Sequence, residues 1–411
     1  MKKLCKQIDI TDIPTILPWV RDCIHRHRKR YDFKKLLIDH GLSIEDYFEA
    51  IACTDYTKWD TAIHNIAADA AQSIYERCLD LKTPTITHRL DGASGKDRDI
   101  GCESAMQQVF DFIAVYSSMP VFNRRIVKQQ ASSVEGRGQI YGMRMIRKWA
   151  INNTSGIEYA KRHGYRPKDR MKWFVKLDVK KCFPSCRVDV FLRYFEKDCG
   201  NPDIIWLWQV LLYSHHINGY KGFMIGALTS QWAAQYMLSF AYHYAMSIKK
   251  PQRRGTSERA VSHMIMFMDD MMLCGPSRRQ LKRAVLMLIN YLDRDFSLSI
   301  KPNWNIQRFS EDCGIDMMGF VVYPSGKTVI RARDWVKVRR MLIRSQAKGY
   351  KVSYKQAKRL TSYKGYIKHS NSFYIARQYH AQAVFQAAQR IVSENERFGV
   401  KNGTRAVQLT T

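Results

Sequence analysis

The sequence lacks the features that mark a secreted, zinc-binding or membrane-spanning protein. Its ten cysteines form no Cys-x-x-Cys pair, and Cys182 and Cys186 have no histidine near them in sequence, which favours reduced thiols over a zinc site. No run approaches the roughly 20 consecutive apolar residues that a membrane-spanning helix needs. The basic N-terminus has neither a clean apolar stretch nor a small-residue cleavage site. These absences predict a cytoplasmic protein with no membrane partner.

Acidic charge is also in short supply. The 411 residues include 67 Lys and Arg against 37 Asp and Glu, which gives a formal net charge of +30. Solubility alone is a weak explanation for this excess, because the long-range field that it creates attracts polyanions. An apolar content of 45% is typical of a globular chain, and the length predicts two or three subdomains. We therefore expect nucleic acid to be the main partner.

Helix and strand patterns are mixed along the chain, which predicts an α+β fold. Residues 1–88 have mainly helical patterns, including a helix that begins at the capping residue Ser43. Further helices are expected after Gly226, where the pattern is strongly apolar, and after Ser277, where it is amphipathic. The expected strands and hairpins are a basic loop or hairpin at Arg89 to Gly101, a strand at Lys172 to Val179, and hairpins at His263 to Gly275 and around Pro324 to Gly326.

The region after Arg331 is helical and strongly basic. From Arg331 to Lys368 there are thirteen Lys or Arg and one acid, Asp334, with aromatic residues interleaved. A solvated helix face is one interpretation. The lack of compensating acids and the presence of rings that can stack on bases favour a surface that grips a nucleic-acid backbone. The candidate contacts are Arg333, Lys337, Arg340, Lys355, Lys358 and Arg359.

Two adjacent aspartates, Asp269 and Asp270, interrupt the apolar stretch "MIMFMDDMMLC". Aspartate is common in turns, so the pair alone is weak evidence of a site, although unpaired carboxylates are expensive to desolvate. Asp178 closes a second expected strand, and neighbouring strands would bring the three carboxylates to one edge of a sheet. Converging carboxylates repel unless cations neutralise them, and oxygen ligands suit Mg²⁺. Two such ions about 3.5–4 Å apart would activate a primer hydroxyl and stabilise a leaving pyrophosphate.

The order of these motifs, over about residues 90 to 330, resembles the reverse transcriptases, the right-handed palm polymerases of retroelements. "VKLDVKKCFPS" resembles the first palm block, and "FMDD" is similar to the aromatic-x-Asp-Asp box, with Phe267 in place of the commoner Tyr. "LSIKPNW" and "IDMMGFVVY" resemble the next block and the hairpin that supports the primer. Upstream, "GKDRDI", "VFNRRIV" and "SSVEGRGQIYG" resemble the fingers blocks.

This resemblance implies roles for individual residues. It makes Asp178, Asp269 and Asp270 catalytic and, with Val179, ligands of two Mg²⁺ ions, for which Mn²⁺ is an alternative. An aromatic ring at Phe183 would lie under the sugar of the incoming nucleotide and clash with a 2′-hydroxyl, although a core phenylalanine is the alternative interpretation. The implied nucleotide-binding residues are Lys96, Arg98, Phe183, Ile225, Gly226, Ser230, Gln231 and Lys301.

The stretch "MIGALTSQW" narrows the resemblance to bacterial enzymes. Ile225 stands where many reverse transcriptases have Gln, and Ser230-Gln231 is similar to diversity-generating retroelement enzymes and to phage-defence and abortive-infection relatives. In the diversity-generating enzymes an aliphatic residue at this position goes with poor fidelity opposite template adenine. The implied partners are a structured non-coding RNA template, an RNA/DNA primer duplex and dNTPs, with an accessory protein or a second copy as further candidates.

The resemblance implies a right-handed polymerase with an antiparallel palm sheet. The expected organisation is a helical N-terminal region at 1–88, fingers at 89–170, a palm at 171–330, and a basic helical thumb with a C-terminal tail at 331–411. On this division we expect neither an RNase H nor an integrase domain after the thumb, and no His/Asn endonuclease cluster. The N-terminal region carries no recognisable motif.

The main hypothesis is an RNA-directed DNA polymerase that copies a dedicated non-coding RNA in a bacterial or phage-infected cell, with anti-phage defence preferred over diversification. The long N-terminal region favours defence, because diversity-generating enzymes are compact. One alternative is a non-catalytic RNA-binding protein on a polymerase scaffold, which the intact set of three aspartates opposes. Another is a template-independent or protein-primed polymerase, which the 22 tyrosines leave open.

Overall fold

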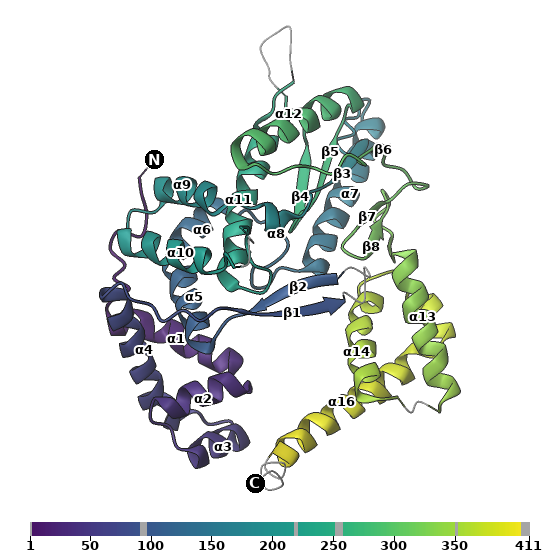
Figure 1. Ribbon diagram of the computed structural model, residues 1–411. Coiled ribbons are helices and arrows are strands. Elements are labelled where there is room, and N and C mark those ends of the chain that lie inside the picture. Colours follow the sequence, from purple (N-terminus) through teal and green to yellow (C-terminus); the bar gives the residue numbers. More distant parts are fainter. Residues whose placement is uncertain (1, 91–96, 218–220, 251–257, 350–351, 404–411) are drawn as a thin grey trace.

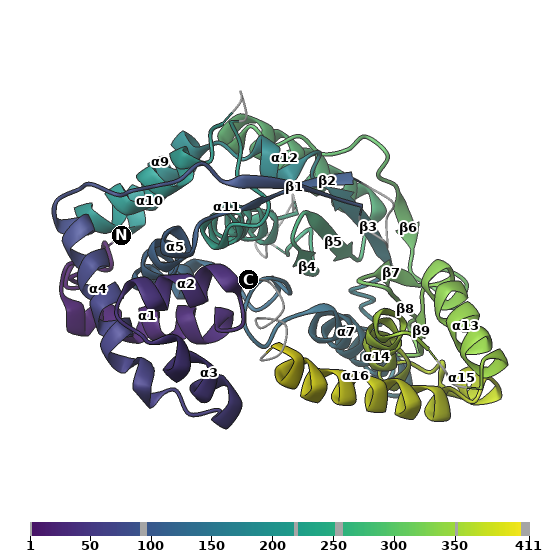
Figure 2. The same cartoon turned by 60° about the horizontal axis from the view of Figure 1, so that its bottom comes forward.

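The structure is a computed structural model that describes residues 2–90, 97–217, 221–250, 258–349 and 352–403. It is a mixed fold of helices and antiparallel sheets, as expected from the sequence. Figure 2 shows the elements arranged along an arc, with the N-terminal helices at one end, the C-terminal helices at the other and the main sheet between them. None of the helices in the described ranges is long and apolar enough to cross a bilayer.

The N-terminal part consists of helices that pack on one another and on the next helix of the chain. These are α1 (Ile13–His27), α2 (Tyr31–Asp39), α3 (Ile44–Cys53) and α4 (Asp60–Tyr75), with a short 3₁₀ helix at Thr57–Trp59. The Ser43 side chain accepts a hydrogen bond from the Asp46 N–H, which confirms the predicted cap of α3. A hairpin of β1 (Thr85–Leu90) and β2 (Asp97–Cys102) follows, and confirms the hairpin interpretation of this segment.

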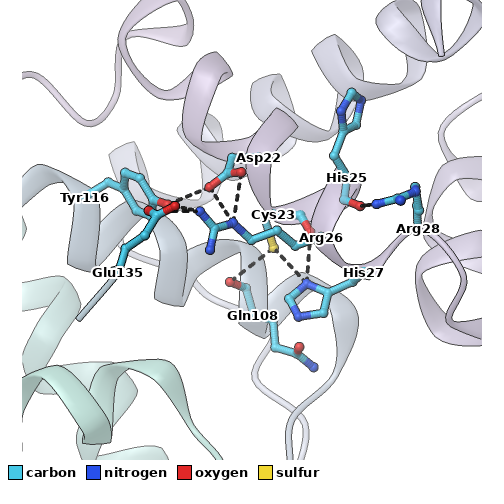
Figure 3. A network of polar contacts seen from close by, with 9 residues as sticks. All are labelled: Asp22, Cys23, His25, Arg26, His27, Arg28, Gln108, Tyr116 and Glu135. Atoms are coloured by element: carbon cyan, nitrogen blue, oxygen red, sulfur yellow. Dashed lines mark hydrogen bonds and ion pairs between the residues drawn. The ribbon is translucent and has the colours of Figure 1, made fainter. Parts of the chain in front are cut away.

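Polar contacts attach α1 to α5 (Ala105–Ser117), as Figure 3 shows. The Tyr116 hydroxyl donates a hydrogen bond to Asp22 at 2.5 Å, and Arg26 donates to the same carboxylate at 2.8 Å. The Cys23 thiol donates to the Gln108 carbonyl at 3.6 Å. Arg26 is thus engaged within the protein, and α1 braces α5.

The main sheet has four antiparallel strands in the order β4-β5-β3-β6. They are β3 (Trp173–Asp178), β4 (His263–Phe267), β5 (Asp270–Gly275) and β6 (Ile306–Arg308). One face packs on α11 (Leu228–Ser247) and α12 (Arg278–Phe296), and the other on α7 (Gln139–Arg162). Because both faces are covered, β4 and β5 are almost continuously apolar and show no simple alternation.

Four further helices complete the central part. They are α6 (Met119–Arg125), α8 (Cys182–Ser185), α9 (Val188–Asp198) and α10 (Pro202–Ser214). All ten cysteines are free.

The C-terminal part has its own small sheet and its own core. The sheet has three antiparallel strands, β7 (Ile315–Met317), β8 (Phe320–Val322) and β9 (Thr328–Ile330), and the last two form the hairpin predicted around Pro324 to Gly326. Helices α13 (Ala332–Ala347), α14 (Tyr354–Lys368), α15 (Phe373–Gln378) and α16 (Ala381–Gly403) follow, and bury a separate apolar cluster that includes Val338, Leu360 and Val384.

Candidate active site

The predicted aspartates meet at one end of the main sheet. In the antiparallel pairing of β3 with β5, Asp178 lies directly across from Asp270. The Val179 N–H donates a hydrogen bond to the Asp269 carbonyl at 3.2 Å, so the turn carrying Asp269 is joined to the chain that leaves β3. The two strands are therefore neighbours, as the carboxylate hypothesis required.

The charges of these aspartates are incompletely compensated. Although the Asp270 side chain reaches water, desolvation by the surrounding protein and the charges of Asp269 and Asp178 raise its pKa to about 6. Desolvation and Asp178 also raise the pKa of Asp269, while Lys301 and Arg98 act in the opposite direction. The Asp178 Oδ1 atom is buried, and no hydrogen-bond partner for it lies among the residues that the structure describes. An additional cation would stabilise this arrangement.

Lys301 supplies positive charge at the same place. Its ammonium donates to Asp178 Oδ2 at 2.6 Å, and its main-chain N–H donates to the Asp178 carbonyl at 2.9 Å. An antiparallel bridge between Val179 and Ile300 holds the two segments together. A cavity of about 430 Å³ opens beside this pair, and its lining includes Asp178, Asp270, Lys301, Asn303, Gln307 and Arg331.

The donor atoms fit a hard divalent cation. Three carboxylates and the main-chain carbonyl of Val179 offer only oxygen, which is what Mg²⁺ and Mn²⁺ accept. Among the described residues, however, no three His, Cys, Asp or Glu side chains are already grouped as a metal site. Like charges repel when no cation lies between them, and Lys301 draws Asp178 toward itself. The orphaned Asp178 Oδ1 and the raised pKa of Asp270 are the observations that favour a cation here.

Phe183 lies close to the predicted nucleotide loop. It is half-buried on α8, where its ring packs at the edge of the main core, and its carbonyl accepts a hydrogen bond from the Phe223 N–H at 2.8 Å. A Cβ atom on Gly222 would come within 2.4 Å of the Pro184 carbonyl oxygen. The segment before Ile225 is therefore pressed directly against the turn that bears Phe183.

Ile225 and Gly226 are held against β2. The Gly101 N–H donates to the Ile225 carbonyl at 2.8 Å. Gly226 has a φ of 121°, and a Cβ atom there would lie 2.3 Å from the Gly101 carbonyl oxygen. Both the backbone conformation and the close approach require glycine at this position.

The other expected nucleotide-binding residues differ in whether they lie near the aspartates. Arg98 is on β2, and its charge acts on Asp269, whereas Lys96 lies outside the described residues. Ser230 is fully buried in α11, and in the described part of the chain its hydroxyl has no hydrogen-bond partner; Gln231 is half-buried beside it. Arg98 and Lys301 thus act on the aspartates, while Ser230 faces the protein interior.

A buried polar network behind this loop was missed from the sequence. Asp111 on α5 accepts hydrogen bonds from the N–H groups of Leu228 and Thr229, at 3.0 and 3.2 Å, where α11 begins. Nearby, His215 Nε2 lies 2.7 Å from Glu103 Oε1. Burial raises the pKa of Glu103 to about 7 and lowers that of His215, which favours a hydrogen bond between neutral groups over an ion pair. The available signal was an aspartate inside the apolar run "VFDFIAV".

The structure places the predicted basic contacts on α13 and α14. Lys337 is half-buried and the other five are exposed. Lys337, Arg340 and Arg359 line one cavity of about 330 Å³ together with Tyr363 and Tyr366. The other three predicted contacts do not line this cavity: Arg333, Lys355 and Lys358.

A family model matches the part of the chain that contains the candidate site. The family model described as "Reverse transcriptase (RNA-dependent DNA polymerase)" matches residues 120–305, a range that contains Asp178, Asp269, Asp270 and Lys301. Among solved structures, the chain is similar to telomerase from Candida albicans in complex with a TWJ fragment of telomeric RNA, with a TM-score of 0.40, 11% identity, and coverage of 90% of this chain and 77% of that chain. No curated protein sequence matches significantly. The chain thus carries a reverse transcriptase domain and is an RNA-directed DNA polymerase, a nucleotidyltransferase.

Proposed function

We propose that the protein copies a dedicated, structured non-coding RNA into DNA by two-metal nucleotidyl transfer, in the cytoplasm of a bacterial cell and in defence against phage. The observation that carries the chemical part is the pairing of Asp178 with Asp270 next to the Asp269 turn, with an orphaned carboxylate oxygen and a raised Asp270 pKa. Such an arrangement is costly for a protein that needs only a stable core.

In this proposal Asp178, Asp269, Asp270 and the Val179 carbonyl hold two Mg²⁺ ions, and Mn²⁺ can replace them. When bound, the ions activate the primer hydroxyl and neutralise the charge on the leaving pyrophosphate. Lys301 would then exchange Asp178 for the triphosphate, because the cations take over neutralisation of the carboxylate. Arg98 would contact the phosphates from β2, and Lys96, two residues before it in sequence, would contribute a second positive charge.

Selection of the nucleotide would take place between α8 and the loop after Met224. Phe183 would exclude a 2′-hydroxyl, which matches its half-buried ring. Ile225 and Gly226 would face the nucleotide from the other side, with Gly226 allowing the close approach to β2. Ser230 and Gln231 would support this loop from the first turn of α11.

The expected division of the chain follows from the same assignment. Residues 89–170 would form the fingers, 171–330 the palm, and 331–411 the thumb with the C-terminal tail. The exposed Lys and Arg side chains on α13 and α14 of the thumb would hold the RNA/DNA duplex. Residues 1–88 would brace the fingers, which is supported by the contacts of Asp22, Cys23 and Arg26 with α5.

Sequencing of the nucleic acid that co-purifies with the protein from cells, with and without phage infection, tests the proposal. The wild type is compared with the Asp269→Ala/Asp270→Ala double variant. We expect DNA complementary to one fixed RNA with the wild type only. If both samples hold the same RNA and no DNA under either condition, the protein is an RNA-binding protein on a polymerase scaffold and the proposal fails.

A diversity-generating role is the second candidate, and Ile225 is the residue that favours it. The recovered DNA would then contain errors concentrated opposite template adenine, and Ile225→Gln would reduce them. This result would favour the diversity-generating role over the defence role. Faithful copying of adenine by the wild type would exclude this alternative. DNA without a complementary RNA would instead indicate template-independent or protein-primed synthesis.

A further inference from the structure

The turn that carries Asp269 has an unusual backbone. Met268 and Asp269 form the two-residue connection between β4 and β5, and Met268 has a φ of 52°. Two-residue hairpin turns need a positive φ at the first central position, which glycine or asparagine normally provides. A methionine there costs about 1 kcal/mol, so the surrounding structure must hold it.

Three side chains from two distant segments hold Met268. Its N–H donates a hydrogen bond to the Ser132 hydroxyl at 2.8 Å. The Ser133 hydroxyl donates to the Met268 sulfur at 3.3 Å, and the Gln235 amide nitrogen lies 3.1 Å from the same sulfur. Ser132 and Gln235 are both buried. Both the main chain and the side chain of Met268 are therefore fixed.

The groups that hold Met268 are themselves held. The Gln235 amide donates to the Ser132 hydroxyl at 2.9 Å, and the Gln130 amide donates to the Gln235 side-chain oxygen at 2.7 Å. Main-chain hydrogen bonds of 2.9 and 2.8 Å tie Gln129 and Ala131 to Met266 on β4. A buried network whose members are mutually satisfied is rigid, because each lost bond would leave a costly unpaired group.

We propose that Ser132 and Gln235 are positioning residues that aim Asp269 at the metal site by fixing the backbone of Met268. A role in core stability alone would not require the network to end on the N–H and the sulfur of the residue directly before Asp269. The opposite side of the turn is held through the Asp269 carbonyl and the Val179 N–H, so Ser132 and Gln235 complete the clamp. This inference rests on the proposed function of Asp269.

The test uses Ser132→Ala and Met268→Leu in the full chain, with Ser239→Ala as control. Ser239 is a buried serine on α11 whose hydroxyl donates a hydrogen bond to the Tyr236 carbonyl of its own helix. For each protein the measurements are kcat, the primer–template Kd, the affinity for Mn²⁺ without substrates by calorimetry, and the midpoint of thermal unfolding. Met268→Leu keeps the size of the side chain and removes the sulfur acceptor, so it covers the case in which Ser132→Ala unfolds.

We expect Ser132→Ala to lower kcat roughly tenfold to hundredfold and to weaken Mn²⁺ binding, with primer–template Kd unchanged. Met268→Leu should show a smaller loss of the same kind, and Ser239→Ala should behave as the wild type. The inference is overturned if Ser132→Ala and Met268→Leu both keep the wild-type kcat and Mn²⁺ affinity. It is also overturned if these variants lose only thermal stability. If the wild type makes no DNA, the proposed function fails, and the positioning role is decided by Mn²⁺ affinity alone.

Discussion

The ammonium of Lys301 lies 2.6 Å from Asp178 Oδ2, so the candidate site already contains one cation opposite its first carboxylate. Both side chains are about one third exposed, at 33% and 34%, and they line the cavity at the end of β3. A partly exposed pair of this kind contributes little to stability. In the proposed function its significance is chemical, because Lys301 would leave Asp178 for the triphosphate of the incoming nucleotide.

Replacing Lys301 by methionine should separate these two effects. We expect the KM for dNTP to rise roughly tenfold to hundredfold, since a charge-assisted contact with the triphosphate is lost. The Mg²⁺ concentration for half-maximal activity should fall, because Asp178 loses its competing cation. Steady-state kinetics measure both, and Lys301→Arg, which keeps the charge, is the control. An unchanged KM for dNTP would contradict the assignment.

Removing either aspartate of the pair should abolish DNA synthesis without unfolding the protein. In Asp269→Ala and Asp270→Ala the metal ligand is lost, but so is repulsion that raises the pKa of both groups. We expect the free energy of unfolding without metal to be unchanged or slightly higher. Primer extension and chemical denaturation are the measurements, with the exposed Asp312→Ala as control. Normal synthesis by either variant would refute the metal assignment.

Activity should fall in acid, and magnesium should shift the fall. Desolvation and the neighbouring carboxylates raise the pKa of Asp270 to about 6, so the metal-binding form is lost as pH decreases through that value. Mg²⁺ and protons compete for the same oxygens, so a higher Mg²⁺ concentration should move the acid limb to lower pH. The measurement is kcat/KM against pH at two Mg²⁺ concentrations. An acid limb that does not move would exclude Asp270 as the group responsible.

Phe183→Ala should admit ribonucleotides. Loss of the ring opens space for a 2′-hydroxyl, and we expect the preference for dNTP over rNTP to fall roughly tenfold to hundredfold. Phe183→Tyr, which keeps a ring at this position, should retain the preference. Incorporation of each nucleotide into a primer measures the ratio. If Phe183→Ala keeps the full preference, Phe183 serves the core and has no part in sugar selection.

The exposed Lys and Arg side chains of α14 should contribute to binding of the template–primer duplex. Replacing Lys355, Lys358 and Arg359 together by glutamine should weaken binding and reduce the slope of log affinity against log salt by roughly two to three. Fluorescence anisotropy at several salt concentrations measures both quantities.

The control removes the same number of charges elsewhere. Helix α12 lies at the opposite side of the molecule from α14 in Figure 1, and carries Arg279, Lys282 and Arg283. We expect their joint replacement by glutamine to have little effect on duplex affinity. Equal losses from both triple variants would indicate that only net charge matters, and would remove any specific role from α14.

Local structure was largely predictable from local patterns. The strand that ends at Asp178, the hairpin around Asp269 and Asp270, the helix that begins after Ser277 and the cap at Ser43 are all present. Each depends on residues close together in sequence: an apolar run, a turn residue, a 3.6-residue period or a capping hydroxyl. The residues proposed for the candidate site could be named for the same reason, since strand ends and carboxylates can be identified without knowing which strands pair.

Only the tertiary structure decided which residues these side chains contact. The alignment of Asp178 with Asp270 and the contact of Lys301 with Asp178 join segments more than 90 residues apart. Met268 is held by Ser132, 136 residues before it, and by Gln235, 33 residues before it. The sequence determined which side chains could serve the chemistry. Their partners depend on strand register and helix packing, which are set by long-range burial of apolar surface and have no local signature.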